Sequence, residues 1–202
     1  MAPGSPADQR RSRPQGRETR ARLLQAGLEV LAERGYHATR VDDVVRAAEV
    51  SHGTFYLYFA SKEELFAALA RDTASEVGAL VAGLGPVDDG EAGRDELRRW
   101  LQDFLDAYRR HGPVIRVWME NQARGRDLRK LANETFADVI GSLERRMRAE
   151  GGPGGAPVRA VALLAMVERF AYFVVSRRLE VDDDRLLDTL TLVVQRGFFS
   201  EA

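Results

Sequence analysis

The chain has 202 residues, of which 45% are hydrophobic, and this suits one or two globular domains with a sizeable core. It contains no cysteine, which excludes disulfides and thiolate metal sites and is compatible with a reducing cytoplasm. No apolar run approaches the roughly 20 residues that span a bilayer, and the first 17 residues lack the apolar segment of a secretory signal. We therefore expect a cytoplasmic protein that does not associate with a membrane.

The formal net charge is −1, but the charge is unevenly distributed. Residues 1–62 carry 10 Lys and Arg against 7 Asp and Glu, a net charge of +3, so the remainder carries −4. This asymmetry favours a polyanionic partner for the front part of the chain only. The difference is modest and does not by itself establish DNA binding.

The N-terminal residues 1–15 are rich in Pro, Gly, Ser and Arg, a composition that predicts a disordered basic arm. Its arginines are Arg10, Arg11 and Arg13. They either form a solvated tail or contact phosphates and the minor groove of DNA.

A first helix is expected over residues 17–34. Its apolar face consists of residues at helical spacing: Leu23, Leu24, Gly27, Val30 and Leu31. Gly35 is expected to end the helix as a C-cap glycine. Thr39 is then expected to cap a second helix, with Asp42 three residues later resembling a capping box.

Residues 41–59 indicate two short helices joined by a tight turn. Their buried faces are marked by Val44, Val45 and Ala48 in the first helix and by Phe55 and Phe59 in the second. Ser51 is expected to cap the second helix through its side-chain oxygen. A helix this short is unstable alone in water, so it must be held by packing, with its polar face outward. That is the requirement for a recognition helix in the major groove of DNA.

Four motifs at fixed spacing carry a resemblance to a known family. They are Gly35-Tyr36-His37-Ala38-Thr39, Val44-Val45-Arg46-Ala47-Ala48, the run SHGTFYLYF over residues 51–59, and Ser61-Lys62-Glu63-Glu64-Leu65. Together they resemble the DNA-binding domain of TetR-family transcriptional regulators over about residues 17–70. The resemblance implies a three-helix, helix-turn-helix DNA-binding domain and a homodimer.

The resemblance also implies roles for individual residues. Contacts with bases and nearby phosphates are implied for Ser51, His52, Gly53 and Thr54, and contact with base edges or a thymine methyl for Tyr56. Contacts with the DNA backbone are implied for Arg40, Val41, Tyr58 and Lys62. His52 is equally compatible with a solvated helix start, and Tyr58 with a cover over the helix pair.

Two residues depart from the family pattern. Val41 stands where a threonine is frequent, and its side chain cannot donate a hydrogen bond; Arg40 can substitute by charge. Glu49 stands in the turn where a glycine is common, and its carboxylate is not expected to face DNA.

The Ser61-Lys62-Glu63-Glu64 run is expected to open a long helix to about Val81, with Ser61 and Glu64 forming a capping box. Residues 83–93 are Gly-rich and predict a connection to a second domain. A further helix is expected from Glu91 or Asp95 to about Arg110. Others are expected over 113–123, 127–150, 158–179 and 182–199, with Pro113 in the first turn of the first of these.

No alternating β-type run is present, so the chain is predicted to be all-α with about nine helices. The predicted domains are a disordered basic arm over residues 1–15, a helix-turn-helix DNA-binding domain over 16–62, and a helical effector-binding and dimerisation domain over 63–202.

The last two predicted helices are apolar on more than one face, which indicates burial on several sides. We expect them to form a four-helix bundle with the same pair of a second chain; the alternative is a monomer with a thick core. An effector pocket is expected in the middle of the second domain. Its candidate lining residues are Trp100, Phe104, Tyr108, Trp118, Met119, Glu120, Phe136, Met166 and Phe170, with Asn121, Gln122, Glu168 and Tyr172 as further candidates. Aromatic residues at helical spacing are also compatible with an ordinary core.

These features predict a TetR-like regulator, a homodimeric repressor released from a palindromic double-stranded DNA operator by a small apolar or aromatic molecule. One alternative is a DNA-binding activator or ligand-independent regulator, and another is a helical binding module or enzyme without DNA binding. His37, His52 and His111 lack metal-ligand spacing, and the chain has no HExxH, GxSxG or P-loop motif. Enzymatic activity, a cofactor and a metal are therefore not expected.

Overall fold

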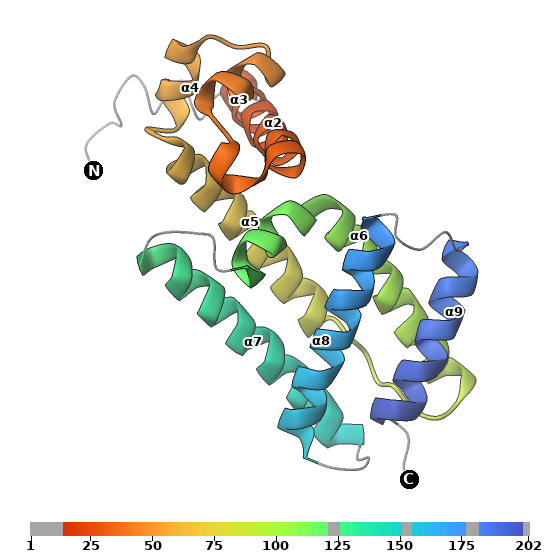
Figure 1. Ribbon diagram of the computed structural model, residues 1–202. Helices are drawn as coiled ribbons and strands as arrows, with labels where there is room; N and C mark the ends of the chain where they lie inside the picture. The colour runs from red at the N-terminus through yellow and green to blue at the C-terminus, as the bar shows by residue number, and fades with distance from the viewer. Residues whose placement is uncertain (1–13, 121–125, 151–154, 177–181, 200–202) are drawn as a thin grey trace. The chain divides into compact units, whose positions relative to one another are not determined.

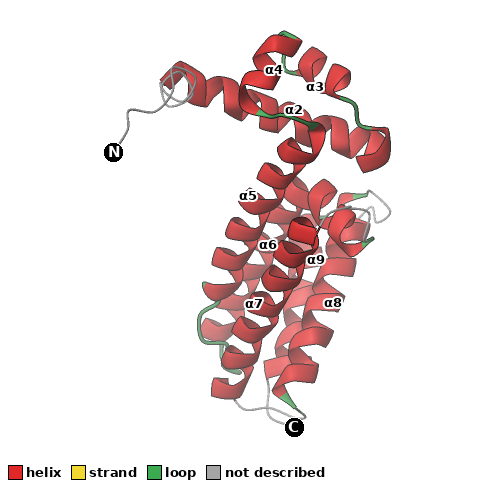
Figure 2. Cartoon of the chain, turned by 90° about the vertical axis from the view of Figure 1, so that its left-hand side faces the viewer, coloured by secondary structure: helices red, strands yellow, loops and turns green. Residues whose placement is uncertain are grey.

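The computed structural model describes residues 14–120, 126–150, 155–176 and 182–199. Within these ranges every regular element is a helix and no strand is present (Figure 2), which confirms the predicted all-α class. In chain order the elements are α2 (Pro14–Ala38), α3 (Val41–Ala47), α4 (His52–Tyr58), α5 (Lys62–Ala82), α6 (Glu91–Met119), α7 (Arg126–Glu150), α8 (Ala156–Val175), α9 (Asp183–Val194) and the π-helix η1 (Gln195–Phe199). Across the same ranges, no helix combines the length and the apolar character needed to cross a membrane.

The chain forms two compact units. The first comprises Met1–Thr73 with Pro113–Arg129, and the second comprises Ala74–Gly112 with Lys130–Ala202. The divisions fall inside α5, α6 and α7, so each of these helices contributes residues to both units. The domain boundary between residues 62 and 63 that the sequence suggests stays a prediction.

The first unit contains the three helices α2, α3 and α4 (Figure 1). Their shared core is formed by buried apolar residues, Leu23, Val30 and Leu31 of α2, Val44 and Val45 of α3, and Phe55 of α4. Helix α2 begins at Pro14, about three residues earlier than predicted, because a proline in the first turn removes only an N–H that has no helical partner. The predicted basic arm at Arg10, Arg11 and Arg13 lies outside the described residues.

Gly35 breaks the regular helix three residues before the end of α2, with φ 75° and ψ 169°. This left-handed conformation confirms the predicted helix-ending role of the glycine. The predicted cap at Thr39 is wrong. Its Oγ1 donates to the carbonyl of Gly35 at 2.7 Å, and the N-cap of α3 is Arg40, without a side-chain cap bond. The same carbonyl also accepts from the backbone N–H of Thr39 at 3.2 Å, so both donors of Thr39 bond back to Gly35.

Helix α6 corrects the prediction of two helices on either side of Pro113. The chain continues as one helix from Glu91 to Met119 with Pro113 inside it. A proline there removes one backbone hydrogen bond, but Val114 and Val117 beyond it are buried and continue the apolar face. Burial of that face compensates for the lost bond, and the division between the two units falls at Pro113.

The second unit packs the inner faces of α6 to α9 around fully buried aliphatic residues, Leu97, Leu101, Leu143, Leu163 and Leu187. Arg98 of α6 donates to both Asp184 and Asp188 of α9, at 2.7 Å each. The buried Arg159 of α8 donates to the carbonyl of Met147 in α7 and to that of Phe198 in η1. These bonds tie helices distant in the sequence to one another.

The connection between α5 and α6 is held from the C-terminal end of the chain. Gln195 of η1 is buried, and its Nε2 donates to the carbonyls of Asp88 and Gly90 at 2.7 and 3.2 Å. Asp88 Oδ1 in turn accepts from the backbone N–H groups of Gly90 and Gly93. A Cβ atom on Gly93 would lie 2.4 Å from the Asp88 backbone, so this close approach requires glycine.

Glu49 has φ 53°, the only positive φ of a non-glycine residue among the described residues. It lies in the turn between α3 and α4, so the turn requires the left-handed conformation that glycine adopts without steric cost. An L-residue there is disfavoured by about 1–2 kcal/mol. The family preference for glycine at this position thus has a backbone cause.

Replacing Glu49 by glycine is expected to raise the free energy of unfolding by a few tenths to about 1 kcal/mol, because relief of the backbone conformation exceeds the entropy gained by the unfolded chain. Urea unfolding followed by circular dichroism measures the change. The control is Glu49→Gln, which removes the charge and keeps the Cβ atom, and it should leave the stability unchanged. Equal stabilisation by both variants would assign the effect to charge and contradict the backbone explanation.

Candidate nucleic-acid interface and effector site

Helix α4 is held in place by its cap and by two aromatic residues. The Ser51 Oγ accepts from the backbone N–H of Thr54 at 3.1 Å, which confirms the predicted cap. Phe55 is fully buried and Phe59 nearly so, with ring centroids 5.9 Å apart. The Arg20 guanidinium of α2 lies 5.8 Å from the centre of the Phe59 ring. One face of α4 is therefore fixed against the rest of the unit.

The other face of α4 is open to solvent. Tyr56 is 54% exposed and Leu57 is 47% exposed, and the backbone of Gly53 is exposed beside them. A Cβ atom on Gly53 would meet only the Ser51 Oγ, at 3.7 Å, which is an ordinary contact. Nothing in the described part of the unit therefore requires glycine at this position. Leu57 was not singled out by sequence reasoning, and its exposure is the signal that adds it to this face.

His52 and Asp42 join the starts of α3 and α4. The His52 Nε2 lies 2.7 Å from the Asp42 Oδ1, and both side chains are exposed. The hydrogen bond from His52 holds the pKa of the Asp42 carboxyl below its ordinary value, and the charges of Arg40 and Arg46 act in the same direction. With Nε2 occupied by the carboxylate, the Nδ1 atom is the ring nitrogen left for an external partner.

The remaining predicted DNA contacts surround this face. Thr54 is half-buried and its hydroxyl lies 3.0 Å from that of Ser51. Arg40 is exposed as the N-cap of α3, while Val41 and Tyr58 are half-buried. The structure thus brings the residues of α4 and the start of α3 into one unit, and contact with DNA stays a prediction for each of them.

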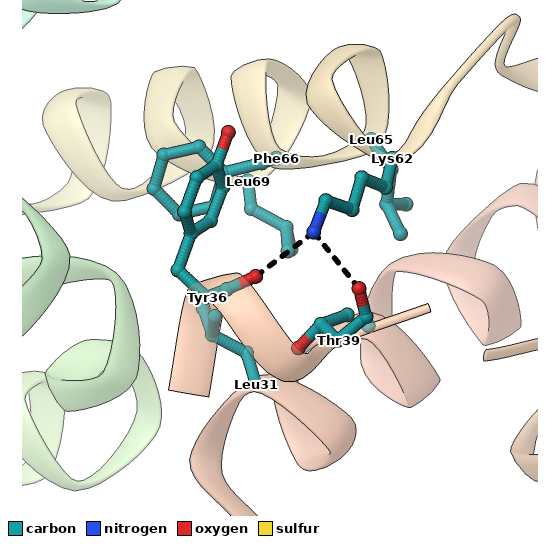
Figure 3. Close-up of a pocket in the computed structure, with 8 residues that line it drawn as sticks. Leu31, Tyr36, Thr39, Lys62, Leu65, Phe66 and Leu69 are labelled. Atoms are coloured by element: carbon teal, nitrogen blue, oxygen red, sulfur yellow. Dashed lines mark hydrogen bonds between the residues drawn. The ribbon is translucent and has the colours of Figure 1, made fainter. Parts of the chain in front are cut away.

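Lys62 occupies a position that the sequence did not suggest. Its ammonium nitrogen lies 3.1 Å from the carbonyl oxygen of Tyr36 and 2.9 Å from that of Thr39 (Figure 3). It also lies 3.4 Å from the carbonyl oxygen of His37 and 5.2 Å from the centre of the Tyr36 ring. A phosphate contact for Lys62 stays a prediction, but all of these partners belong to the protein itself.

Asp43 is a buried carboxylate that sequence reasoning missed. Its Oδ1 lies 3.1 Å from Arg34 of α2 and 3.9 Å from Arg46 of α3, and it is 9% exposed. The Oδ2 atom is buried without a hydrogen-bond partner among the described residues. The signal in the sequence was a carboxylate directly before the buried pair Val44 and Val45, on a helix that turns its apolar face inward.

The predicted effector residues divide between the two units. Trp118, Met119 and Glu120 belong to the first unit, and the other six belong to the second. Met119 and Glu120 are exposed, and the Trp118 indole nitrogen is buried without a partner among the described residues. Asn121 and Gln122 lie outside the described residues.

Three of the second unit's candidates are packed on α6. Trp100, Phe104 and Tyr108 are buried, with successive ring centroids 5.7 and 6.4 Å apart. Trp100 donates to the carbonyl of Leu80, and the Tyr108 hydroxyl donates to the buried Glu168 carboxylate at 3.0 Å. Phe136 is exposed, and Met166 and Phe170 are half-buried.

Two hollows in the second unit lie elsewhere. One of about 350 Å³ is lined by residues of α5 and α6, namely Glu76, Ala79, Leu80, Asp103, Asp106, Ala107 and Arg110. One of about 260 Å³ is lined by Val81, Ala82, Leu84, Ser142, Arg145 and Arg146. Neither hollow is lined by a predicted effector residue, so the predicted pocket stays a prediction.

Comparison with known proteins matches residues 23–69 to the family model described as bacterial regulatory proteins, tetR family. The HTH-type transcriptional repressor Rv3405c of Mycobacterium tuberculosis is 34% identical over 105 residues, which cover 51% of this chain and 56% of that protein. The transcriptional regulator AcuR of Cereibacter sphaeroides is 32% identical over 152 residues, which cover 72% of this chain and 67% of AcuR. The chain therefore spans about half the length of the first of these relatives.

Solved structures share the fold. The crystal structure of the MbdR regulator from Azoarcus sp. CIB matches with a TM-score of 0.71, covering 90% of this chain and 100% of that one. The sequence identity is 17%, so this likeness establishes the fold alone.

The pair formed by Asp42 and His52 gives a prediction that needs no DNA. Removal of the imidazole in His52→Ala should raise the pKa of the Asp42 carboxyl towards its ordinary value, because the hydrogen bond from His52 is the largest cause of the lowering. The rise should be incomplete, since Arg40 and Arg46 remain. A carbon-detected NMR titration of the carboxyl measures it, and His37→Ala is the matched control.

The sign of the accompanying stability effect follows from the lowered pKa. A carboxyl with a lowered folded-state pKa stabilises the fold above its unfolded pKa and loses that contribution as pH falls through the folded value. The difference in stability between wild type and His52→Ala should therefore shrink on acidification. An unchanged pKa of Asp42 in His52→Ala would show that the pair does not form in solution.

Proposed function

Because the chain belongs to the TetR family of bacterial regulatory proteins, we propose that it is a transcriptional regulator that binds a palindromic DNA operator as a homodimer. The observation that carries the proposal is helix α4, whose inner face is buried and capped while its outer face is exposed. A short helix presented in this way fits the major groove of DNA.

The outer face of α4 supplies the groups that read bases. Thr54 and His52 provide a hydroxyl and a ring nitrogen, and the exposed Tyr56 ring provides apolar surface for a thymine methyl. Packing against the residues that the structure describes does not require Gly53, so we attribute it to close approach of the helix to base edges. Arg40 and Tyr58 flank this face and are assigned to the phosphates, consistent with the net charge of +3 over residues 1–62.

Dimerisation is assigned to the outer faces of α8 and α9. Val158 is 74% exposed and Val193 is 49% exposed. The other exposed apolar residues of these two helices are Val161, Phe173, Val175 and Leu192. An apolar surface of this kind, which the described residues leave exposed, is typical of an interface. A second copy of the same helices would bury it and would place two α4 helices for two half-sites about 34–36 Å apart.

Repression is the mode we propose, since one relative is named a transcriptional repressor. A small apolar or aromatic effector would release the operator through its higher affinity for an arrangement that does not fit DNA. The packed Trp100, Phe104 and Tyr108 favour the alternative of a regulator without an effector, because their rings already fill the space between helices. Co-crystals grown from a ligand screen would decide between the two.

The base-reading assignment predicts the effect of changing Tyr56. Tyr56→Ala should weaken operator binding by about 1–3 kcal/mol and relax the base preference at the contacted position. Tyr56→Phe should retain most of the affinity, because the ring makes the contact. Selection of bound sequences from random duplex DNA, followed by titration of the best duplex, measures both quantities. Unaltered affinity and preference in Tyr56→Ala would remove α4 from the base-reading role.

The dimer assignment predicts the effect of placing charge on α8. Val158→Asp with Val161→Asp should convert a dimer into a monomer and abolish high-affinity operator binding, because two carboxylates would be desolvated in the interface. Sedimentation velocity measures the oligomeric state. Ala137→Asp, at an exposed position of α7, is the control and should remain dimeric. A dimer that persists in the doubly charged variant would place the interface elsewhere.

A further inference from the structure

The first residue of α5 closes the end of α2. Lys62 places its ammonium within hydrogen-bond distance of the backbone carbonyls of Tyr36, His37 and Thr39. An ammonium has three N–H donors and no acceptor. Three carbonyls therefore match its full donor capacity, and the Tyr36 ring, 5.2 Å from the ammonium, adds a cation–π contact (Figure 3).

These carbonyls need an external donor because α2 ends there. Gly35 turns the chain through a left-handed conformation, and Tyr36 and His37 follow this break in the last turn of α2, whose carbonyls have no partner in their own helix. Thr39 lies just beyond the end of α2. A cation at a helix C-terminus is also favoured by the helix dipole. In the first turn of α5 the same cation is disfavoured by the dipole of that helix, and the bonds to the end of α2 offset that cost.

The contact fixes more than one helix end. Thr39 directly precedes Arg40, the N-cap of α3. Lys62 therefore holds the corner between α2 and α3, and α3 leads on to α4, the helix proposed to read bases. On the other side of Lys62, the N-terminus of α5 is capped by Ser61, which accepts from the N–H of Glu64, while Glu64 accepts from the N–H of Ala60. We call this contact between the start of α5 and the corner after α2 the joint. Because both sides are bonded, neither α5 nor the corner can rotate without moving the other.

The apolar side of the joint is closely packed. The Tyr36 and Phe66 rings meet edge to face with centroids 4.9 Å apart. A Cβ atom on Gly27 of α2 would lie 2.9 Å from Leu65 Cδ2, so α2 and α5 approach each other closely at that point. A cavity of only about 20 Å³ remains under the ammonium. This packing leaves little room for α5 to shift against α2 without moving the corner.

We propose that Lys62 is a positioning residue, which locks α5 to the corner between α2 and α3 and so sets the angle of the reading helices, and that it is not a phosphate ligand. The proposal rests on the proposed DNA binding. A movement of α5 is then passed to α3 and α4 through polar bonds at the first residue of the helix. A lysine that leaves these carbonyls for a phosphate would leave the end of α2 without its donor.

The composition of the chain allows a direct test, because Lys62 and Lys130 are its only lysines. The Lys130 side chain is 71% exposed on α7, and its Nζ atom lies 3.7 Å from Oε1 of Glu134 on the same helix. Quantitative lysine acetylation read by mass spectrometry should therefore label Lys130 quickly and Lys62 at least about tenfold more slowly in the protein without DNA. Addition of the selected operator should protect Lys62 little further. Labelling of Lys62 at the rate of Lys130, followed by protection on DNA, would overturn the proposal.

Salt dependence separates positioning from phosphate binding. Lys62→Met should lower the midpoint of thermal unfolding by about 4–8 °C and weaken operator binding about 3- to 30-fold at a temperature where the variant is folded. Its slope of log affinity against log salt should equal that of wild type. A slope reduced by about 1 would show a phosphate contact, and unchanged affinity in the folded variant would show a role in stability alone. Either result contradicts the proposal.

The conservative variant supplies the last comparison. Lys62→Arg keeps the charge, and a phosphate contact should tolerate it because arginine binds phosphate well. The planar guanidinium cannot direct its donors at three carbonyls around one point, so positioning should not be rescued and affinity should stay near that of Lys62→Met. Lys130→Met is the control for loss of a lysine charge and should bind as wild type does. If wild type itself binds no duplex, the proposed function fails, while the acetylation result on the free protein still tests the joint.

Discussion

The exposed face of α4 depends on the burial of the other side of this helix. This helix has only seven residues, and a helix of that length is unstable alone in water. Phe55 and Phe59 supply the burial, and the Ser51 side chain satisfies an N–H that the first turn would otherwise leave without a partner. Because the inner face is fixed in this way, the outer face can carry exposed residues such as Tyr56 without loss of the helix.

A second constraint lies at the end of α2, where the chain must turn sharply into α3. Gly35 makes the turn possible, and its carbonyl accepts from both the N–H and the hydroxyl of Thr39. Lys62 donates to the carbonyls that follow the turn, including that of Thr39. The positive charge of Lys62 is unfavourable at the N-terminus of α5 but favourable at the C-terminus of α2. The charge at the start of α5 and the free carbonyls at the end of α2 thus stabilise each other. This contact makes the junction of α2 and α5 a rigid part of the first unit.

Local features of the sequence predicted much of the fold. Period 3.6 patterns gave the all-α class, and the cap at Ser51 and the break at Gly35 involve residues at most three positions apart, so each was visible without a tertiary model. The errors arose where packing or an alternative hydrogen bond overrides the local rule. Pro113 stays inside α6 because buried residues beyond it hold the helix, and Thr39 turns to a carbonyl of α2 instead of capping α3.

The ion pair of Asp43 with Arg34 and the bonds of Lys62 also join residues that the sequence separates, and no spacing rule gives them. The aromatic residues proposed for an effector show the same limit, since helical spacing places Trp100 and Phe104 on one face of α6 but does not distinguish a packed face from the wall of a pocket.

The two exposed surfaces of the protein differ in chemistry, and the difference indicates different partners. The α4 face combines hydroxyls, a ring nitrogen and an aromatic ring with the positive charge of residues 1–62, which suits a polar, anionic duplex. The exposed face of α8 and α9 carries apolar side chains, such as Val158 and Phe173, which make no favourable contacts with a charged duplex. A second copy of the chain has the matching apolar surface. Because one α4 offers only a few contacts, operator binding by the proposed dimer would depend on the apolar surface between the two copies as much as on the residues assigned to DNA.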